Sequence, residues 1–319
     1  MPAITKKAKP ITLAEPPAKK SLGEHLRKYW QLYVMMLIPV VYYIIFRYLP
    51  MAGNIIAFRR YRAGSSIFGD EWSGLKYFNQ FIKDANFWRA FKNTLLLNFK
   101  YLLISFPLTI IFALLLNELK NVIWKKIVQT VSYLPHFISM VIVAGMVREI
   151  LSTSGPINKL IVSMGGEAIS FISLPEWFTS IFVVSGIWQG IGWGTILYLA
   201  AMSGINPELY EAASLDGANK FQQCLNVTIP AILPTISTLL VLNIGQLCGS
   251  AAFEKVFLLY SPTTYETADI IATYVYRMGL GSGNYSYATA VGLFQGLINL
   301  VLLTVANKVS KKLTGSSLY

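Results

Sequence analysis

The sequence has few of the residues from which catalytic and metal sites are usually built: two cysteines and two histidines among 319 residues. Neither His25 nor His136 stands in a metal-ligand or catalytic-triad spacing, and no acid, base and nucleophile are grouped together. Cys224 and Cys248 fall in different segments, a polar loop and an apolar run, so they predict no disulfide or metal framework. We therefore expect no catalytic residue and no metal site, which disfavours an enzyme.

A phosphate-binding loop of the form Gly-x-x-x-x-Gly-Lys-Ser/Thr is also missing, so the chain cannot cradle ATP by that route. Any ATP-driven step must come from a partner, and we expect no cofactor in this chain. Acidic residues are outnumbered by basic ones, 15 against 27, which leaves a net charge of +12. The basic residues are scattered without an aromatic-stacking or groove-reading motif, so they do not predict nucleic-acid binding. They favour attraction to anionic membrane lipid.

Long apolar runs are what the sequence has in abundance. It is 54% hydrophobic and 13% charged, with a mean hydropathy of +0.51, more apolar than a typical soluble domain. A helix needs about 20 mostly apolar residues to cross the hydrocarbon layer of a membrane. The segments that qualify are residues 30–49, 94–117, 128–148, 179–202, 231–252 and 286–307. We therefore expect an all-α integral membrane protein with six transmembrane helices and both termini on one side.

The distribution of Lys and Arg indicates which side that is. Clusters at 19–28, 120–126 and 308–312 lie directly beside span ends, as is typical of cytoplasmic segments. The bias is small because the loop at 51–92, on the other side, is basic too. We expect both termini in the cytoplasm, and we expect no cleavable signal peptide before the first span. The predicted parts are an N-terminal tail (1–29, disordered over its first 20 residues), a transmembrane domain (30–307) and a C-terminal tail (308–319).

A polar interruption between the fourth and fifth spans, at residues 203–230, has the signals of a short helix. Asn206 can cap such a helix, Pro207 is tolerated in its first turn, and Glu208 is favourable at the positive helix end. Gly217 can adopt the left-handed conformation that ends it. A helix of about ten residues is marginal in water by itself. This loop is therefore predicted to pack on another surface.

The residues of this helix favour a protein as that surface. Ala212 and Ala213 are small enough to allow close approach, and Glu211 offers a carboxylate for a directional pair with an arginine. The residues predicted to dock are Glu208, Tyr210, Glu211, Ala212, Ala213, Asp216 and Gly217.

This loop resembles that of a known family. Glu211-Ala212-Ala213, followed by three residues, Gly217 and later Ile229-Pro230, is similar to the signature loop of permease subunits in type I ABC importers. Further stretches resemble the carbohydrate branch of that family, and within it the lipoprotein-type permeases for polysaccharides and oligosaccharides. They are residues 50–53, 93–95, 192–201, 207–213, 269, 273–277 and 285–294. The resemblance runs from about residue 30 to the end of the chain.

The resemblance implies partners and a mechanism. It implies a second, similar permease subunit, two copies of a cytosolic ATPase that bind ATP and Mg²⁺, and an external sugar-binding protein, all in a bacterial plasma membrane. The loop at 203–230 would be the cytoplasmic coupling helix, and the pore would alternate between inward-facing and outward-facing states as the ATPases close. The outer segment at 253–285 would meet the binding protein, although such a segment can also be a plain connection between spans. The implied substrate is an oligosaccharide or polysaccharide fragment.

Polar and aromatic residues inside the predicted spans are candidates for the substrate pathway. They are Trp188, Gln189 and Trp193 in the fourth span, Asn243 and Gln246 in the fifth, and Gln295 and Asn299 in the sixth. Amides can bind sugar hydroxyls and indole rings can stack on sugars. The alternative is that the amides bond between helices, that the glycines around them allow close helix packing, and that the tryptophans lie at an interface. The sequence leaves both interpretations open.

A second functional class also remains, namely a stand-alone secondary transporter or channel for a polar solute. The spans lack the chain of acidic or basic residues expected for ion coupling, and this class leaves the loop at 203–230 unexplained. The sequence does not indicate which sugar is carried.

Overall fold

The computed structural model describes residues 22–68 and 71–314. Its contacts divide the chain into two units, Met1–Gly53 and Asn54–Tyr319. The predicted disorder of the first 20 residues lies outside the described part. Helix α1 already begins at Leu22, so the last residues of the predicted N-terminal tail are helical.

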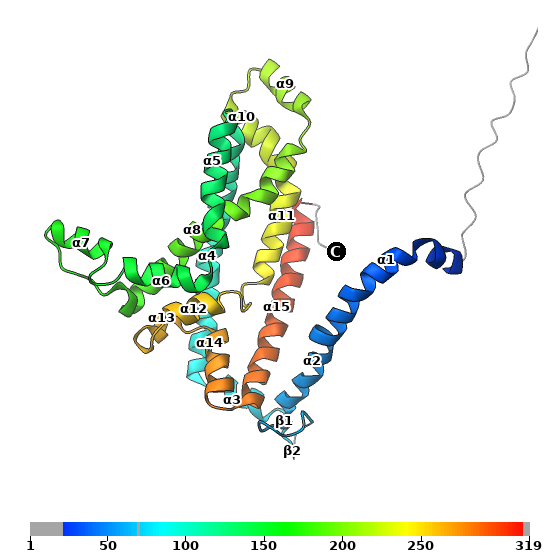
Figure 1. Ribbon diagram of the computed structural model, residues 1–319, viewed down its shortest axis with the longest axis vertical. Coiled ribbons are helices and arrows are strands. Elements are labelled where there is room, and N and C mark those ends of the chain that lie inside the picture. The colour runs from blue at the N-terminus through cyan, green and yellow to red at the C-terminus, as the bar shows by residue number, and fades with distance from the viewer. Residues whose placement is uncertain (1–21, 69–70, 315–319) are drawn as a thin grey trace, which may run out of the picture. The chain divides into compact units, whose positions relative to one another are not determined.

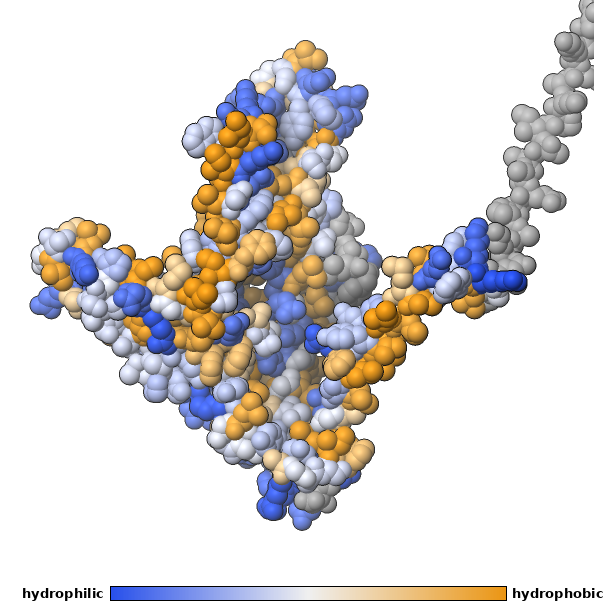
Figure 2. Space-filling view, in the orientation of Figure 1, coloured by the Kyte–Doolittle hydropathy of each residue, from blue (hydrophilic) through white to orange (hydrophobic). Residues whose placement is uncertain are grey.

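The first unit is an apolar helix without a core of its own. It comprises α1 (Leu22–Tyr43), a π-helical turn (Ile44–Tyr48) and α2 (Leu49–Met51). Its apolar side chains are exposed along its length (Figure 2). Leaving so much apolar surface in water is unfavourable, so the helix requires lipid or protein around it. This agrees with the span predicted at 30–49.

The second unit is built on long apolar helices. These are α4 (Ala85–Glu118), α8 (Pro175–Ser203), α11 (Ile229–Gly245) and α15 (Tyr285–Thr314). Helix α4 packs along α8, and α11 packs along α15 (Figure 1). Helix α15 continues through most of the region predicted as a C-terminal tail. Together with the span Leu26–Phe58, which begins in the first unit, the described residues contain five helices long and apolar enough to cross a membrane, or six if one bent pair is counted.

That bent pair replaces the straight third span predicted at 128–148. Helix α5 (Val122–Tyr133) runs through a 3-10 turn (Leu134–Phe137) and is followed by α6 (Met140–Ile150), with a bend of 99° between them. Pro135 cannot donate a backbone hydrogen bond, and Ser139 starts the new helix by accepting from the Ile142 N–H. His136 lies at this bend.

The fifth span also differs from its predicted range of 231–252. It runs from Lys220 to Gly245, through α10 (Lys220–Gln223), a π-helical turn (Cys224–Thr228) and α11. The helix ends because Gln246 leaves helical geometry at φ −102° and ψ 3°. Gln246 and Cys248 therefore follow the helix, which corrects their placement within it. Hydropathy did not find this boundary because the chain beyond it is still apolar.

Short elements connect the long helices. The only strands in the described part of the chain are β1 (Arg59–Arg60) and β2 (Glu71–Trp72), which pair antiparallel. The short helices are α3 (Lys76–Ile82), α7 (Pro156–Ser163), α9 (Pro207–Leu215), α12 (Phe253–Leu259), α13 (Tyr265–Ala268) and α14 (Ile271–Tyr276). Further 3-10 or π-helical turns lie at Ala52–Phe58, Phe171–Ser173, Pro262–Thr264 and Arg277–Gly281. The fold class is all-α, as predicted.

Buried polar contacts hold the end of the second unit that carries α3 and α14. Asp269 is fully buried and forms a two-pronged ion pair with Arg277, at 2.6 and 3.1 Å. Asp84, which caps α4, accepts a hydrogen bond from the Tyr274 hydroxyl at 2.5 Å and one from Tyr287 at 3.2 Å. The bonds of Asp84 tie α4, α14 and α15 together.

Candidate docking loop and translocation groove

Helix α9 has the capping that its sequence predicts. The Asn206 side chain accepts a hydrogen bond from the Glu208 N–H at 3.1 Å. At the other end, Gly217 has a φ of +81°, and the Ala218 N–H reaches back to the Ala213 carbonyl at 2.9 Å. This six-to-one bond is that of a Schellman motif, which requires a left-handed residue. The helix therefore begins and ends where its local sequence dictates.

Hydrogen bonds brace α9 against the foot of the fifth span. The Tyr210 hydroxyl lies 3.0 Å from Thr228 Oγ1. The Gln223 amide donates to Ser214 Oγ at 2.8 Å and to the Ala218 carbonyl at 3.1 Å. Gln223 and Thr228 are buried. These bonds connect α9 to the helix that continues into α11.

The other face of α9 is exposed, and the side-chain hydrogen bond on it is local, from the Asn206 amide to the Glu208 carboxylate at 3.0 Å. It carries Glu208, Glu211, Ala212 and Asp216 at the end of the second unit seen at the top of Figure 1. Sequence analysis missed two apolar side chains beside them: Leu215, at 89% exposure, and Phe221, at 71%. Large apolar residues exposed together within polar surroundings mark an interaction surface. The signal in the sequence was an apolar residue on either side of the terminating Gly217, within a loop that is otherwise polar.

A groove runs between α4, α8 and α11. It consists of two adjoining cavities of about 380 and 400 Å³. The residues that line both cavities are Tyr101, Leu102, Gly190 and Asn243. Gln189 and Gln246 line the first cavity, and Trp193 lines the second. Four residues of the predicted pathway therefore share one groove.

The side chains of these four residues differ in whether they already contact another part of the protein. Gln189 donates to the Ile138 carbonyl at 3.2 Å, where the third span is broken, and Asn243 donates to the Leu239 carbonyl at 2.7 Å. The Gln246 side chain makes no hydrogen bond to any described residue and is exposed. Trp193 stacks on His136, with ring centres 4.4 Å apart and planes 5° from parallel. Gln246 is therefore the freest of these polar groups to bind a ligand.

The glycines of α8 serve close packing, the alternative that the sequence left open. A β-carbon at Gly194 would lie 2.8 Å from the Thr109 methyl group, and one at Gly186 would lie 2.7 Å from the Tyr101 ring. Both neighbours belong to α4. Helices α4 and α8 can approach this closely only because these positions lack side chains.

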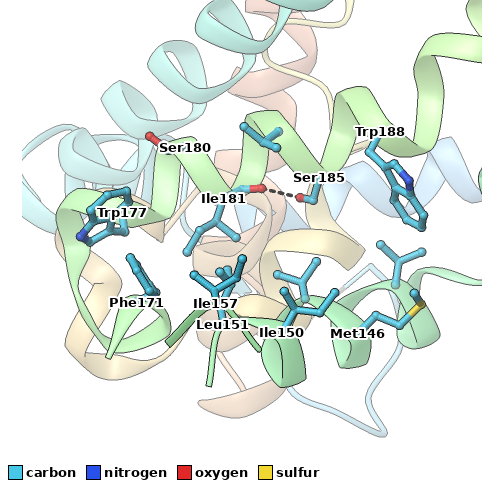
Figure 3. Close-up of a pocket in the computed structure, with 13 residues that line it drawn as sticks. Met146, Ile150, Leu151, Ile157, Phe171, Trp177, Ser180, Ile181, Ser185 and Trp188 are labelled. Atoms are coloured by element: carbon cyan, nitrogen blue, oxygen red, sulfur yellow. Dashed lines mark hydrogen bonds between the residues drawn. The ribbon is translucent and has the colours of Figure 1, made fainter. Parts of the chain in front are cut away.

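The remaining predicted pathway residues lie elsewhere. Trp188 lines a separate cavity of about 530 Å³ whose lining is almost entirely apolar and is formed by α6, α7 and α8 (Figure 3). On α15, Asn299 accepts from the Cys248 N–H at 3.1 Å, and Gln295 donates to the Cys248 carbonyl. These two amides thus bind both polar groups of one buried backbone residue. Their bonds join α15 to the turn that follows α11.

Lys255 is a residue of the groove that sequence analysis missed. It lies on α12 with 5% of its surface exposed and lines the first cavity. Its Nζ donates to the Phe182 carbonyl at 2.6 Å and lies 4.6 Å from the centre of the Phe182 ring. Burial lowers the pKa of Lys255 to about 7. In the sequence it is only one of several cations between the last two spans, so nothing distinguishes it there.

Within the described ranges, no three His, Cys, Asp or Glu side chains come together as a metal site would need. The two described ion pairs are Arg60–Glu71 and Arg277–Asp269. The arrangement as a whole provides a braced surface helix at one end and a polar groove between apolar helices.

Comparison with known proteins gives a consistent result. A family profile described as binding-protein-dependent transport system inner membrane component matches residues 85–315. The polygalacturonan/rhamnogalacturonan transport system permease protein YteP of Bacillus subtilis (strain 168) is 44% identical over 90% of this chain and 90% of its own. Protein LplB of the same organism is 43% identical over 90% of this chain and 91% of its own.

A solved structure is similar as well. It is a crystal structure of a bacterial alginate ABC transporter in complex with an alginate pentasaccharide-bound periplasmic protein. A chain in it superposes with a TM-score of 0.85 at 42% identity, covering 93% of this chain and 99% of that one.

Proposed function

Because the chain belongs to the family of binding-protein-dependent transport system inner membrane components, we propose that it is the permease subunit of an ATP-driven importer for oligosaccharides or polysaccharide fragments. The observation that carries this proposal is α9, a capped helix that is braced on one face and exposes carboxylates and Leu215 on the other, with Phe221 of α10 exposed beyond it in the same loop. The names of its relatives, which refer to polygalacturonan, rhamnogalacturonan and alginate, support an oligosaccharide as the cargo.

The proposal includes the subunits that this chain needs. Two copies of a cytosolic ATPase would bind ATP and Mg²⁺, and one of them would receive α9. A second, similar permease would complete the pore, and an external sugar-binding protein would deliver the substrate, as a periplasmic protein does in the similar alginate transporter. Both termini and the loop at 203–230 would face the cytoplasm.

The mechanism follows from the bracing of α9. Closure of the ATPases would move α9 as a rigid lever, because its caps and the Tyr210–Thr228 bond prevent it from moving alone. The motion would pass into α11, which contributes Asn243 to the groove. A rocking motion of the helices around the groove would then alternate its opening between the two sides of the membrane.

Replacement of Glu211 by Lys tests this proposal. We expect the variant to reach the membrane but to lose both co-purification of the ATPase and oligosaccharide uptake. A carboxylate lost from a buried intersubunit pair leaves its arginine uncompensated, at a cost of about 3–5 kcal/mol. Glu167→Lys is the matched control, since Glu167 is an exposed carboxylate in the loop after α7, and it should retain the ATPase.

Two results would reject the proposal. One is wild-type uptake and ATPase association in Glu211→Lys, which would remove the docking role of α9. The other is uptake by the wild-type chain with no ATPase in the purified complex, which would favour a secondary transporter or channel.

A further inference from the structure

We propose that Lys255 is a substrate-binding residue whose ammonium group pairs with a carboxylate of the transported sugar, so that the groove selects acidic, uronate-containing oligosaccharides. This inference rests on the proposed transport function. It adds a specificity-determining residue and a chemical class of substrate.

Lys255 is a buried cation without a counter-charge among the described residues. Lys255 takes part in neither of the two ion pairs found within residues 22–68 and 71–314. Its described contacts are the Phe182 carbonyl and the Phe182 ring. An ammonium group has three N–H donors, and the structure gives a partner to one of them. An unpaired buried charge is costly, and a carboxylate that enters the cavity removes that cost.

The space for the ammonium group depends on a glycine of α8. A β-carbon at Gly186 would lie 2.9 Å from Lys255 Nζ, so the absence of a side chain there leaves room for the cation. Helix α12 is not a candidate membrane span, whereas α8 is. The Lys255 side chain reaches from α12 to the backbone of α8. The cation is thus placed at the wall of the groove rather than in the water outside.

The wall around Lys255 is polar. The cavity that Lys255 lines is also lined by His136 and by residues that carry amides or a hydroxyl: Asn98, Tyr101, Gln189, Asn243 and Gln246. Amides and hydroxyls both donate and accept, which suits the hydroxyls of a sugar ring. One cation beside several neutral polar groups therefore matches a ring that carries hydroxyls and one carboxylate.

A phosphorylated sugar fits this wall less well. A phosphate group carries a charge of about −1.5 to −2 at neutral pH, whereas Lys255 is the sole Lys or Arg lining this cavity. Burial lowers the pKa of Lys255 to about 7. The protonation of Lys255 near neutral pH therefore depends on whether an anion is bound beside it. A bound carboxylate favours the protonated form, so cation and anion stabilise each other on binding.

The test compares Lys255→Met with the wild type in the assembled complex of permeases and ATPases. The probes are trigalacturonate and its fully methyl-esterified form, which has the same ring skeleton without the negative charge. Binding is measured on purified complex without the sugar-binding protein, so that the selectivity of that protein does not enter. Lys159→Met on α7, an exposed lysine outside the groove, is the control for loss of a positive charge.

We expect the wild type and Lys159→Met to bind the acid more tightly than the ester. Lys255→Met should lose at least about tenfold in affinity for the acid, because it removes a hydrogen bond between two charged groups, and should bind the ester as the wild type does. Co-purification of all subunits shows that Lys255→Met has folded. Should that variant not assemble, Lys255→Gln replaces it, with the same expectation.

Several outcomes would overturn the assignment: equal affinity of the wild type for acid and ester, no binding of the acid by the wild type, or equal loss of both probes in the variant. None of these outcomes would contradict the transport proposal, which is tested separately by uptake and ATPase association. If uptake and ATPase association fail in the wild type while the acid-to-ester preference depends on Lys255, the binding site stands and the importer assignment falls.

Discussion

At the scale of single residues, the structure separates side chains that look equivalent in the sequence. Gln246 and Gln295 are both amides in predicted spans. Gln246 has no hydrogen bond to a described residue and lines the groove, whereas Gln295 donates to the Cys248 carbonyl. One is available to a sugar, and the other is already used to hold the turn after α11.

This contrast gives a prediction for Gln246→Leu and Gln295→Leu. The first variant should lower oligosaccharide uptake per assembled complex several-fold with little change in thermal stability, because an apolar group cannot replace hydrogen bonds to sugar hydroxyls. The second should lower the melting temperature of the complex, because it leaves a buried carbonyl unsatisfied at a cost of about 1–3 kcal/mol. Uptake normalised to purified complex, together with thermal unfolding, distinguishes the two. A stability loss in Gln246→Leu with unchanged normalised uptake would assign Gln246 to packing.

At the scale of elements, α9 depends on backbone conformation as well as on contacts. Gly217, which terminates it, has a φ of +81° and no atom within 4 Å of where a β-carbon would be. A substitution there acts through the backbone alone. Gly204, which ends α8, has a φ of −87°, a conformation open to any residue.

We therefore expect Gly217→Val and Gly204→Val to differ. A left-handed conformation costs an L-residue about 1–2 kcal/mol, which should displace the end of α9 and reduce both ATPase co-purification and uptake. Gly204→Val should retain both. Normal ATPase association in Gly217→Val would show that the end of α9 tolerates rearrangement and that docking does not depend on its Schellman motif.

At the scale of the whole molecule, the orientation in the membrane follows from which side bears α9. Cys224, partly exposed, is in the turn that leads from this loop into α11, whereas Cys248 is buried. If the loop is cytoplasmic, as the clusters of Lys and Arg predict, the two sides of the membrane should react differently with a thiol reagent.

The expected result concerns the Cys248→Ser variant. A membrane-impermeant maleimide should leave Cys224 unmodified in intact cells and modify it in inverted vesicles stripped of the ATPase. Denatured protein labelled in parallel controls for reactivity of the thiol. Modification in intact cells would reverse the orientation.

The local sequence determined which segments form apolar helices and where helix α9 begins and ends, because both depend on interactions between residues close together in the chain. An apolar run of about 20 residues requires a helix in lipid, and Asn206, Pro207 and Gly217 start and stop α9 through bonds within their own turn. The docking role of Glu211 remains a prediction. The bend at Pro135 and the end of α11 at Gly245 escaped prediction, because hydropathy does not register a change of direction within an apolar stretch.

Only the tertiary structure decided what the polar residues in and beside the spans do. An amide has the same chemistry in every span, and its role depends on whether a backbone group of another helix comes within hydrogen-bond distance. That is why Gln295 and Asn299 bond to Cys248 while Gln246 faces the groove. It is also why Lys255, one cation among many in the sequence, becomes a buried charge: its side chain reaches from α12 to Phe182 and Gly186 of α8.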